Sequence, residues 1–265
     1  MRTQIGFIGT GVMGQAVIST FLSAGLKPDQ ITFTRKRSEL SKEISEKFGI
    51  REQSLEDLVR SSDLIVLATK PQDLISLLQV IAPFLNPTTL LVSLAAGKST
   101  ASIQEASGGH NPVIRVMPNT PLVVGEGVSA LSATANLSPD EVEWVRSLLA
   151  AGGKAIVVDE SLQDAVTAMS GSGPAYFFAF IEAMVRSGVD LGLSESDATT
   201  LAIATIKGAA VMLESSGKSA TTLRENVTSP NGTTAAALRV LSERGLDEMV
   251  AAAMKAARDR SVELG

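Results

Sequence analysis

The sequence has no cysteine and only one histidine and one tryptophan among its 265 residues. Without cysteine it has neither a disulfide framework nor thiol chemistry, which agrees with a reducing cytoplasm. No segment reaches the roughly 18 uninterrupted apolar residues of a membrane span, and a strand-like run begins by Gln4, which leaves no room for a signal peptide. The net charge is −5 without a long basic run, which disfavours nucleic acid as a partner. We therefore expect a cytoplasmic protein that binds neither nucleic acid nor membrane.

The chain divides into two parts by its pattern of apolar residues. Over residues 4–158, the short runs IGFIG, ITFT, LIVLA, LLVSL, VIRVM and AIVV alternate with helical segments. Buried strands spaced by helices predict a parallel sheet covered on both faces. After Asp159 the apolar residues repeat at three and four positions, as in residues 246–257, which is typical of helices. We expect an α/β dinucleotide-binding domain of Rossmann type over residues 1–159 and an all-helical domain over residues 160–265.

A glycine motif follows the first predicted strand. The stretch IGFIGTGVMGQAV, residues 5–17, places Gly9, Gly11 and Gly14 between a strand and an apolar helix. Gly9 allows the tight turn, Gly11 lets a pyrophosphate approach the backbone, and Gly14 lets the helix pack on the strand. This context favours dinucleotide binding over the alternative, a glycine-rich turn without a ligand.

The end of the second predicted strand bears on which dinucleotide is bound. NAD sites usually have a carboxylate about 20 residues after the glycines, whereas this chain has Thr34, Arg35, Lys36 and Arg37 there. Three cations and a hydroxyl suit a 2′-phosphate, which a carboxylate would repel. The sequence therefore favours NADPH, with NADH as the second choice. A basic start to the next helix that only faces water is the alternative.

Three further segments follow predicted strands. In LATKPQD, Thr69, Lys70 and Pro71 should border the cofactor, because ligands bind beyond the carboxyl ends of the strands. LAAGKST, residues 94–100, has the same position one strand later, and VMPNTPLVVGEG, residues 116–127, reads as a rigid loop over the cleft. A surface charge before the next helix is the alternative for Lys70, and the same ambiguity holds for LAAGKST. For residues 116–127 a plain structural turn is equally plausible.

The chain offers little acid–base chemistry. Reduction of a ketone calls for an acid that protonates the forming oxyanion, and the single histidine, His110, lies in the loop SGGHNP, where we expect it to face solvent. An iminium already carries its proton and needs no such acid, so its reduction requires mainly geometry and exclusion of water. We expect no metal site.

A polar cluster interrupts the helical part at VTSPNGTTAAAL, residues 227–238. Its hydroxyls exceed what a turn needs, and SPNGTT leads into an amphipathic helix over residues 235–243. Backbone N–H groups and hydroxyls that converge on a helix N-terminus favour an anion such as a small carboxylate. Capping of the helix alone is the alternative.

These motifs together resemble one family. FIGTGVMG, ATKPQD, RVMPNTP, SGSGPAYFFAFIEAM and SPNGTTAAALRVL follow one another in the order and spacing of pyrroline-5-carboxylate reductases, through the closing RDRSVEL. The resemblance implies NAD(P)H-dependent reduction of the cyclic imine 1-pyrroline-5-carboxylate to L-proline, the last step of proline biosynthesis, commonly with NADPH. It also implies that the helical domain interleaves with a second chain in a homodimer, and that dimers often assemble into larger rings.

The resemblance and the motifs also imply a set of site residues. Thr234 is the catalytic candidate, placed to hydrogen-bond the ring nitrogen of the imino acid. The residues implied for the imino acid are Ser229, Gly232, Thr233, Thr234, Asn119 and Glu160. Those for the cofactor are Gly9, Thr10, Gly11, Val12, Met13, Gly14, Thr34, Arg35, Lys36, Thr69, Lys70, Pro71, Ala96 and Asn226.

One position departs from the family pattern. The family usually has two glycines after the loop proline, and here Asn231 replaces the first. Asn tolerates a left-handed backbone better than most residues. We therefore expect the loop to keep its shape.

Two other classes stay open at this point. A β-hydroxyacid dehydrogenase shares the plan of a Rossmann domain followed by helices, but that family carries a catalytic lysine where residues 171–186 of this chain have none. A non-catalytic NADP sensor would use the first domain and leave SPNGTT as a bare cap.

The segment AYFFAFIEAMV, residues 175–185, is apolar nearly all round a helix. One amphipathic stripe does not require this many apolar residues, so another helix should cover the excess. Because the helical half is small, we expect that cover to come from a second chain.

Overall fold

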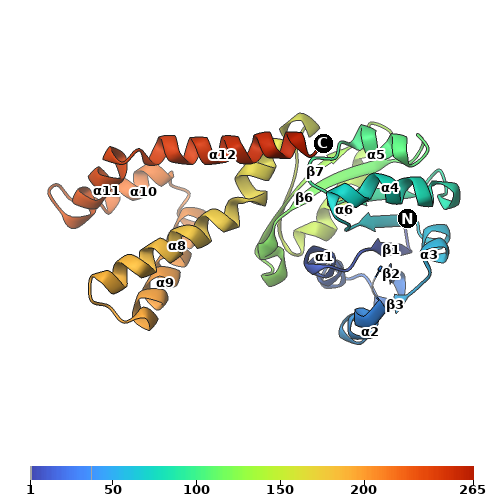
Figure 1. Ribbon diagram of the computed structural model, residues 1–265, viewed down its shortest axis with the longest axis horizontal. Coiled ribbons are helices and arrows are strands. Elements are labelled where there is room, and N and C mark those ends of the chain that lie inside the picture. Colours follow the sequence, from blue (N-terminus) through green and yellow to red (C-terminus); the bar gives the residue numbers. More distant parts are fainter. Residues whose placement is uncertain (1, 37) are drawn as a thin grey trace. The chain divides into compact units, whose positions relative to one another are not determined.

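The computed structural model describes residues 2–36 and 38–265, so Arg37 lies outside the described residues. The chain forms two compact units (Figure 1). The first comprises Met1–Pro174 and Ala256–Gly265, and the second comprises Ala175–Lys255.

A twisted sheet forms the centre of the first unit. Within the described residues it has eight strands in the order β3-β2-β1-β4-β5-β6-β7-β8. The strands are β1 (Ile5–Ile8), β2 (Ile31–Thr34), β3 (Arg51–Glu52), β4 (Leu64–Leu67), β5 (Leu90–Ser93), β6 (Val113–Pro118), β7 (Gly127–Ala133) and β8 (Gly153–Val157). All neighbours are parallel except β6 and β7. The order of the first six strands is that of dinucleotide-binding folds, and it reverses direction between β1 and β4.

Helices cover both faces of this sheet, which explains the continuous apolar runs of its strands. They are α1 (Val12–Ser23), α2 (Ser41–Phe48), α3 (Leu55–Ser61), α4 (Pro71–Ile81), α5 (Thr100–Ala106), α6 (Pro139–Ala150) and α7 (Gln163–Val166). One buried cluster joins the sheet to α1, α2 and α6, and a second joins it to α3, α4 and α5. Phe21 of α1 packs edge-on against Phe7 of β1, with ring centroids 5.8 Å apart. The predicted α/β fold with its covered sheet is confirmed.

The second unit is helical. Its helices are α8 (Gly173–Asp190), α9 (Glu195–Ser216), α10 (Ala220–Asn226), α11 (Thr233–Glu243) and α12 (Leu246–Glu263), of which α8 begins and α12 ends in the first unit. Large apolar side chains of α8 stay exposed, among them Phe177 at 59% and Phe178 at 64%. Large apolar side chains exposed along one helix are typical of a surface that contacts another protein. This unit therefore has an apolar surface of the kind that associates with another chain.

Two strands were missed from the sequence. β7 is antiparallel to β6, because a 3-10 helix over Thr120–Val124 and Gly125, at a φ of 78°, reverses the chain. The predicted parallel sheet therefore holds for every neighbouring pair except β6 and β7. The sequence of β7, GVSALSA, mixes small and polar residues, and β3 spans only two residues, so neither gives a strong strand signal. No described helix is long and apolar enough to cross a membrane.

Candidate active site

A cavity of about 990 Å³ lies at the carboxyl ends of β1, β2 and β4. This is the point where the strand order reverses, and it is where open α/β sheets bind their ligands. The predicted cofactor residues in its lining are Gly9, Thr10, Gly11, Thr34, Arg35, Lys36, Thr69 and Lys70.

The glycine turn has the backbone geometry that a pyrophosphate needs. Gly9 has a φ of 97°, and a Cβ there would lie 2.6 Å from the carbonyl oxygen of Ala68. A Cβ on Gly14 would lie 2.5 Å from the carbonyl oxygen of Gly9, whereas one on Gly11 would meet nothing within 4 Å. Gly9 and Gly14 thus allow close packing, and Gly11 leaves an open approach to the backbone.

Helix α1 begins at this turn without a side-chain cap. Gly11 is the N-cap residue, and the first N–H that bonds within the helix is that of Gln15, to the Gly11 oxygen at 2.9 Å. The N–H groups of Val12, Met13 and Gly14 thus have no partner within the helix. They make the start of α1 suited to an anion, which the helix dipole also favours.

Several buried polar atoms of this cavity have no hydrogen-bond partner in the described part of the chain. They are Oγ1 of Thr10, Oγ1 of Thr69, and Nε and Nη1 of Arg35. Buried polar atoms are nearly always paired in folded proteins. The phosphate oxygens of a dinucleotide would provide acceptors for each of these groups, so the residues present fit a phosphorylated dinucleotide.

Lys70 and Pro71 begin helix α4. Lys70 is its N-cap residue and Pro71 its first helical residue, which agrees with the preference of proline for that position. Pro71 itself is outside the lining of the cavity, and so are Val12, Met13, Gly14 and Ala96. Ala96 is half-buried in the loop that follows β5.

The cavity also contains residues that the sequence analysis missed. Asp73, Ser76, Leu77 and Val80 of α4 line it, together with Leu55 and Gln72. The first four stand at positions i, i+3, i+4 and i+7, which form one face of a helix. That periodicity, read after the Lys70–Pro71 helix start, was a signal that could have identified them.

Asn119 and Glu160 are held by bonds within the first unit. Asn119 is buried, donates to the carbonyl oxygen of Ser170 at 3.2 Å and accepts from the N–H of Val128 at 2.8 Å. The two carboxylate oxygens of Glu160 accept from the N–H and the hydroxyl of Thr100, both at 2.6 Å. Each side chain therefore has a fixed position.

The SPNGTT loop joins α10 to α11 in the second unit. Asn226 is the last residue of α10, and Asn231 has a φ of 60°, a left-handed backbone that asparagine tolerates better than most residues. A Cβ on Gly232 would collide with the hydroxyl of Ser229, and the N–H of Gly232 donates to the Ser229 carbonyl oxygen at 3.0 Å. These contacts make a tight turn that enters α11.

The hydroxyls of this loop do not cap the helix. The N-cap residue of α11 is Gly232, without a side-chain cap bond. Across the described residues, no hydrogen bond involves the hydroxyl of Ser229, Thr233 or Thr234, whereas Thr228 donates to the carbonyl oxygen of Arg224 at 2.6 Å. Capping therefore does not account for the excess of hydroxyls.

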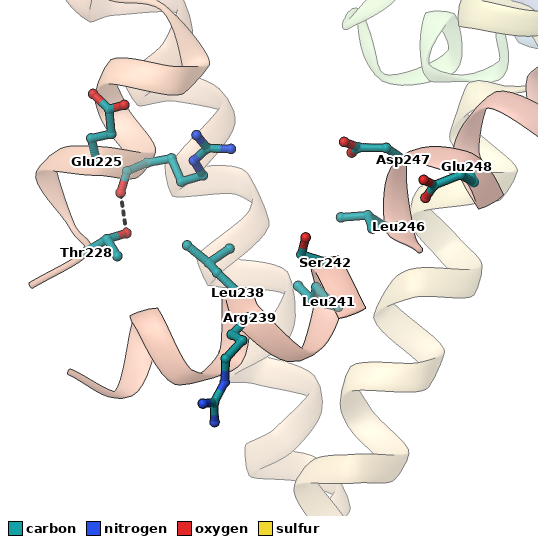
Figure 2. A pocket seen from close by; sticks show the side chains of 10 residues that line it. Glu225, Thr228, Leu238, Arg239, Leu241, Ser242, Leu246, Asp247 and Glu248 are labelled. Carbon is teal, nitrogen blue, oxygen red and sulfur yellow. Dashed lines mark hydrogen bonds between the residues drawn. The ribbon is translucent and has the colours of Figure 1, made fainter. Parts of the chain in front are cut away.

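A second cavity, of about 490 Å³, lies among α10, α11 and the start of α12 and is lined in part by Thr228 (Figure 2). Figure 2 shows the Thr228 bond to the Arg224 backbone. None of the predicted site residues lines this cavity; its lining is Arg224, Glu225, Thr228, Leu238, Arg239, Leu241, Ser242, Leu246, Asp247 and Glu248.

The fold and the first cavity define a dinucleotide-dependent oxidoreductase with an added helical unit. Comparison with known proteins agrees for each part. A family model described as NADP oxidoreductase, coenzyme F420-dependent, matches residues 4–97, and one described as pyrroline-5-carboxylate reductase dimerisation matches residues 160–264.

Relatives match over the full length. A pyrroline-5-carboxylate reductase of Corynebacterium melassecola is 39% identical over 99% of both chains. The solved reductase of Coxiella burnetii has 33% identity and a TM-score of 0.92, covering 99% of this chain and 98% of that one. That of Plasmodium falciparum, solved with NADP bound, has 32% identity and a TM-score of 0.90 with the same coverage. The chain belongs to the pyrroline-5-carboxylate reductase family, as the motifs predicted.

Proposed function

We propose that this protein reduces 1-pyrroline-5-carboxylate to L-proline with NADPH. The hydride adds to the carbon of the protonated C=N bond, and the electron pair of that bond moves to nitrogen, which becomes the ring amine. The observation that carries the proposal is the similarity of the whole chain to reductases of this name, at 39% identity over 99% of its length.

The first unit provides the cofactor site in this proposal. The glycine turn and the start of α1 bind the pyrophosphate through Val12, Met13 and Gly14. Thr10 and Thr69 donate their buried hydroxyls, which have no partner within the described chain. When bound, NADPH supplies the hydride. Lys70, Pro71, Ala96 and Asn226 complete the proposed cofactor residues.

Thr34, Arg35 and Lys36 are proposed to bind the 2′-phosphate of NADPH. All three line the cavity at the end of β2, and two buried guanidinium nitrogens of Arg35 have no hydrogen-bond partner among the described residues. Charge-assisted bonds from arginine to phosphate are strong and directional. This arrangement favours NADPH, with NADH as a poorer cofactor.

The SPNGTT loop is proposed to hold the imino acid. The first-turn N–H groups of α11 and the hydroxyls of Ser229 and Thr233 suit the substrate carboxylate, which needs no arginine there. Gly232 leaves room for the close turn, and the Thr234 hydroxyl orients the ring nitrogen. Asn119 and Glu160 are also proposed to contact the substrate, and hydrogen bonds within the first unit hold both side chains in place.

No general acid is part of this mechanism. The iminium nitrogen enters already protonated, so hydride addition gives the neutral amine without a further proton. His110 is exposed in the loop between α5 and β6, outside the proposed site. The protein's contribution is to orient the two reactants and to exclude water.

The proposal includes a homodimer formed through the helical unit. The exposed apolar side chains of α8 support it, because self-association removes them from water. A ring of dimers and a cytoplasmic location stay predictions from the sequence.

We also propose functional limits for the two domains. Residues 1–159 form the NADP-binding domain, and residues 160–265 form the substrate and dimerisation domain. The end of the last strand at Val157 supports this limit. The compact units divide later, at Pro174, because Asn119 and Arg115 bond to residues that follow the sheet.

The loss of reduced-nicotinamide absorbance on adding the cyclic imine tests the function, with proline identified as the product. The dehydrogenase alternative predicts a different result. NADPH would then be oxidised when a β-keto acid, the oxidised form of a β-hydroxyacid, is added, but not when the imine is added. Tight NADPH binding without turnover of either compound would support the sensor.

A further inference from the structure

The loop that joins β5 to α5, residues 94–99, lies at the same edge of the sheet as the glycine turn, because β1, β4 and β5 are parallel neighbours. It contains Ala96, one of the proposed cofactor residues. Gly97, at a φ of 76°, gives the loop a backbone that other residues rarely adopt. Contacts from elsewhere in the chain must hold this half-buried turn in one conformation if it is to contact a ligand reproducibly.

The last turn of α12 packs directly on the loop. A Cβ on Gly97 would lie 2.7 Å from the backbone oxygen of Ser261 and 2.9 Å from Cβ of Leu264. Lys98 donates from Nζ to the carbonyl oxygen of Gly265 at 3.0 Å. Residues 261–265 thus contact the middle of the loop from a position more than 160 residues later in the chain.

Ser261 fixes this segment to the first unit. Its side chain is 2% exposed, and its hydroxyl donates to Oδ1 of Asp164 at 2.7 Å. The same carboxylate oxygen accepts from Nη2 of Arg115, a buried residue of β6, at 3.3 Å. The segment is therefore bonded through Asp164 to the central sheet.

The other end of the loop is bonded to the same arginine. Thr100, the first residue of α5, donates twice to Glu160 at 2.6 Å, and Nη1 of Arg115 lies 3.8 Å from Oε1 of Glu160. Arg115 thus lies between two carboxylates: that of Glu160, which accepts from Thr100, and that of Asp164, which accepts from Ser261.

We propose that Ser261 is a positioning residue for hydride transfer: through residues 261–265 it holds loop 94–99, and with it Ala96, against the nicotinamide half of the cofactor. Ser261 itself touches neither reactant. The inference rests on the proposed function only in assigning Ala96 to the cofactor. The adenine half, bound by Thr34, Arg35 and Lys36 at the end of β2, is independent of this loop.

Ser261→Ala tests the proposal in the full chain, with Val262→Ala as the matched control. Val262 is the next residue of the same helix, and 59% of it is exposed. We would measure the affinities for NADPH and for adenosine 2′,5′-bisphosphate, which probes the adenine half alone, together with kcat and the KM for NADPH. Ser261→Ala should weaken NADPH binding or turnover by roughly five- to thirtyfold and leave the bisphosphate affinity unchanged. Val262→Ala should have the same two affinities, the same kcat and the same KM for NADPH as the parent protein.

Lys98→Ala and Gly97→Ala provide a second route if Ser261→Ala does not fold. Gly49→Ala is the control for Gly97→Ala: Gly49 has a similar φ of 69°, but a Cβ there would meet only Pro28, at an ordinary 3.5 Å. The variants at positions 97 and 98 should show the same selective loss for NADPH, and Gly49→Ala should not.

Two results would overturn the proposal. One is normal NADPH affinity and kcat in the folded variants, which would leave residues 261–265 a role in stability alone. The other is an equal loss of affinity for NADPH and the bisphosphate, which would indicate a general disturbance of the cofactor domain. A parent protein that fails to reduce the imine would refute the proposed function, yet the comparison of the two binding affinities would still decide this inference.

Discussion

The carbonyl oxygen of Gly9 lies where a side chain on Gly14 would have to stand, 2.5 Å from the position of its Cβ. Because that oxygen belongs to the backbone, it cannot move aside without distorting the turn. We expect Gly14→Ala to lower the free energy of unfolding by about 1 to 3 kcal/mol and to abolish NADPH binding. Chemical denaturation and a fluorescence titration of NADPH measure the two effects.

Gly11→Ala separates binding from stability. A Cβ on Gly11 meets nothing within 4 Å, and its φ of −68° suits alanine. The variant should be as stable as the parent, yet its methyl group would stand where the pyrophosphate approaches, so the KM for NADPH should rise. Normal NADPH binding by Gly11→Ala would place the pyrophosphate elsewhere.

The cations at the end of β2 should decide between the two nicotinamide cofactors. Arg35→Ala combined with Lys36→Ala should raise the KM for NADPH and leave that for NADH nearly unchanged, because only NADPH carries the 2′-phosphate. Loss of charge-assisted bonds of roughly 1.5 to 3 kcal/mol corresponds to about ten- to over a hundredfold. Steady-state kinetics with both cofactors measure the difference, and equal effects on both would show that these cations do not read the phosphate.

Arg2 donates to the carboxylate of Glu141 and to the backbone carbonyl oxygen of Asp63, two residues whose carboxyl pKa values are lowered in the folded protein. The N–H of Ser138 and the side chain of Arg2 hydrogen-bond Glu141 and hold its pKa below the usual value. Burial raises the pKa of Asp63, but hydrogen bonds from Thr3 and Gln4 and the charge of Arg2 outweigh burial and lower it overall. Stability from these groups is therefore fully present above their ordinary pKa values of about 4. It is lost as the pH falls through the lower folded-state values.

Glu141→Gln should remove part of this pH dependence. At neutral pH the variant should be less stable by about 0.5 to 1 kcal/mol, since the partly exposed pair is screened by solvent. The difference from the parent should begin to shrink below about pH 4 and vanish only once the pH is also below the lowered folded-state pKa of Glu141, where the glutamate is protonated in both states. Urea denaturation over a pH series measures this, and Glu46→Gln, which removes an exposed glutamate of α2, is the control. A difference that grows in acid would reverse the sign argued here.

Exposed Phe177 and Phe178 make self-association testable. Replacing both by aspartate should turn the assembled protein into monomers, because two charges would then have to be buried at the apolar surface of α8. Analytical ultracentrifugation at micromolar concentration measures the change. An active, stable monomer of the unmodified protein would contradict the need for a partner chain.

Some features of the fold and site were predictable from the sequence and others were not, and the physical origin of each feature explains the difference. The strands around Phe7 and Phe33 were predictable because burial on both faces makes their sequences continuously apolar. β7 was not, because the reversal at Gly125 depends on a backbone conformation that the sequence shows only as one glycine among many. The contact of Ser261 with Asp164 was also invisible, since 97 residues separate them and no local pattern records such a pairing. At the cofactor site, the glycine spacing was predictable from steric rules, whereas the face of α4 that lines the cavity was overlooked despite its regular period.

Thr234 tests the purpose of the SPNGTT loop. It is the second residue of α11, behind an N-cap glycine without a side-chain cap bond, so Thr234→Ala should change the free energy of unfolding by less than about 0.5 kcal/mol. If its hydroxyl orients the imine nitrogen, the loss should instead appear in the transition state. We expect kcat/KM for the cyclic imine to fall roughly ten- to a hundredfold, with NADPH affinity little changed.

Thr234→Ser is the matched variant, because it keeps the hydroxyl and removes only the methyl group. It should recover much of the activity that alanine loses, which a role in packing would not allow. Steady-state kinetics under conditions where circular dichroism shows all three proteins folded make the comparison direct. A Thr234→Ala protein with the kcat/KM of the parent would show that this hydroxyl does not act on the imine, and the hydroxyls of Ser229 and Thr233 would then be the next to test.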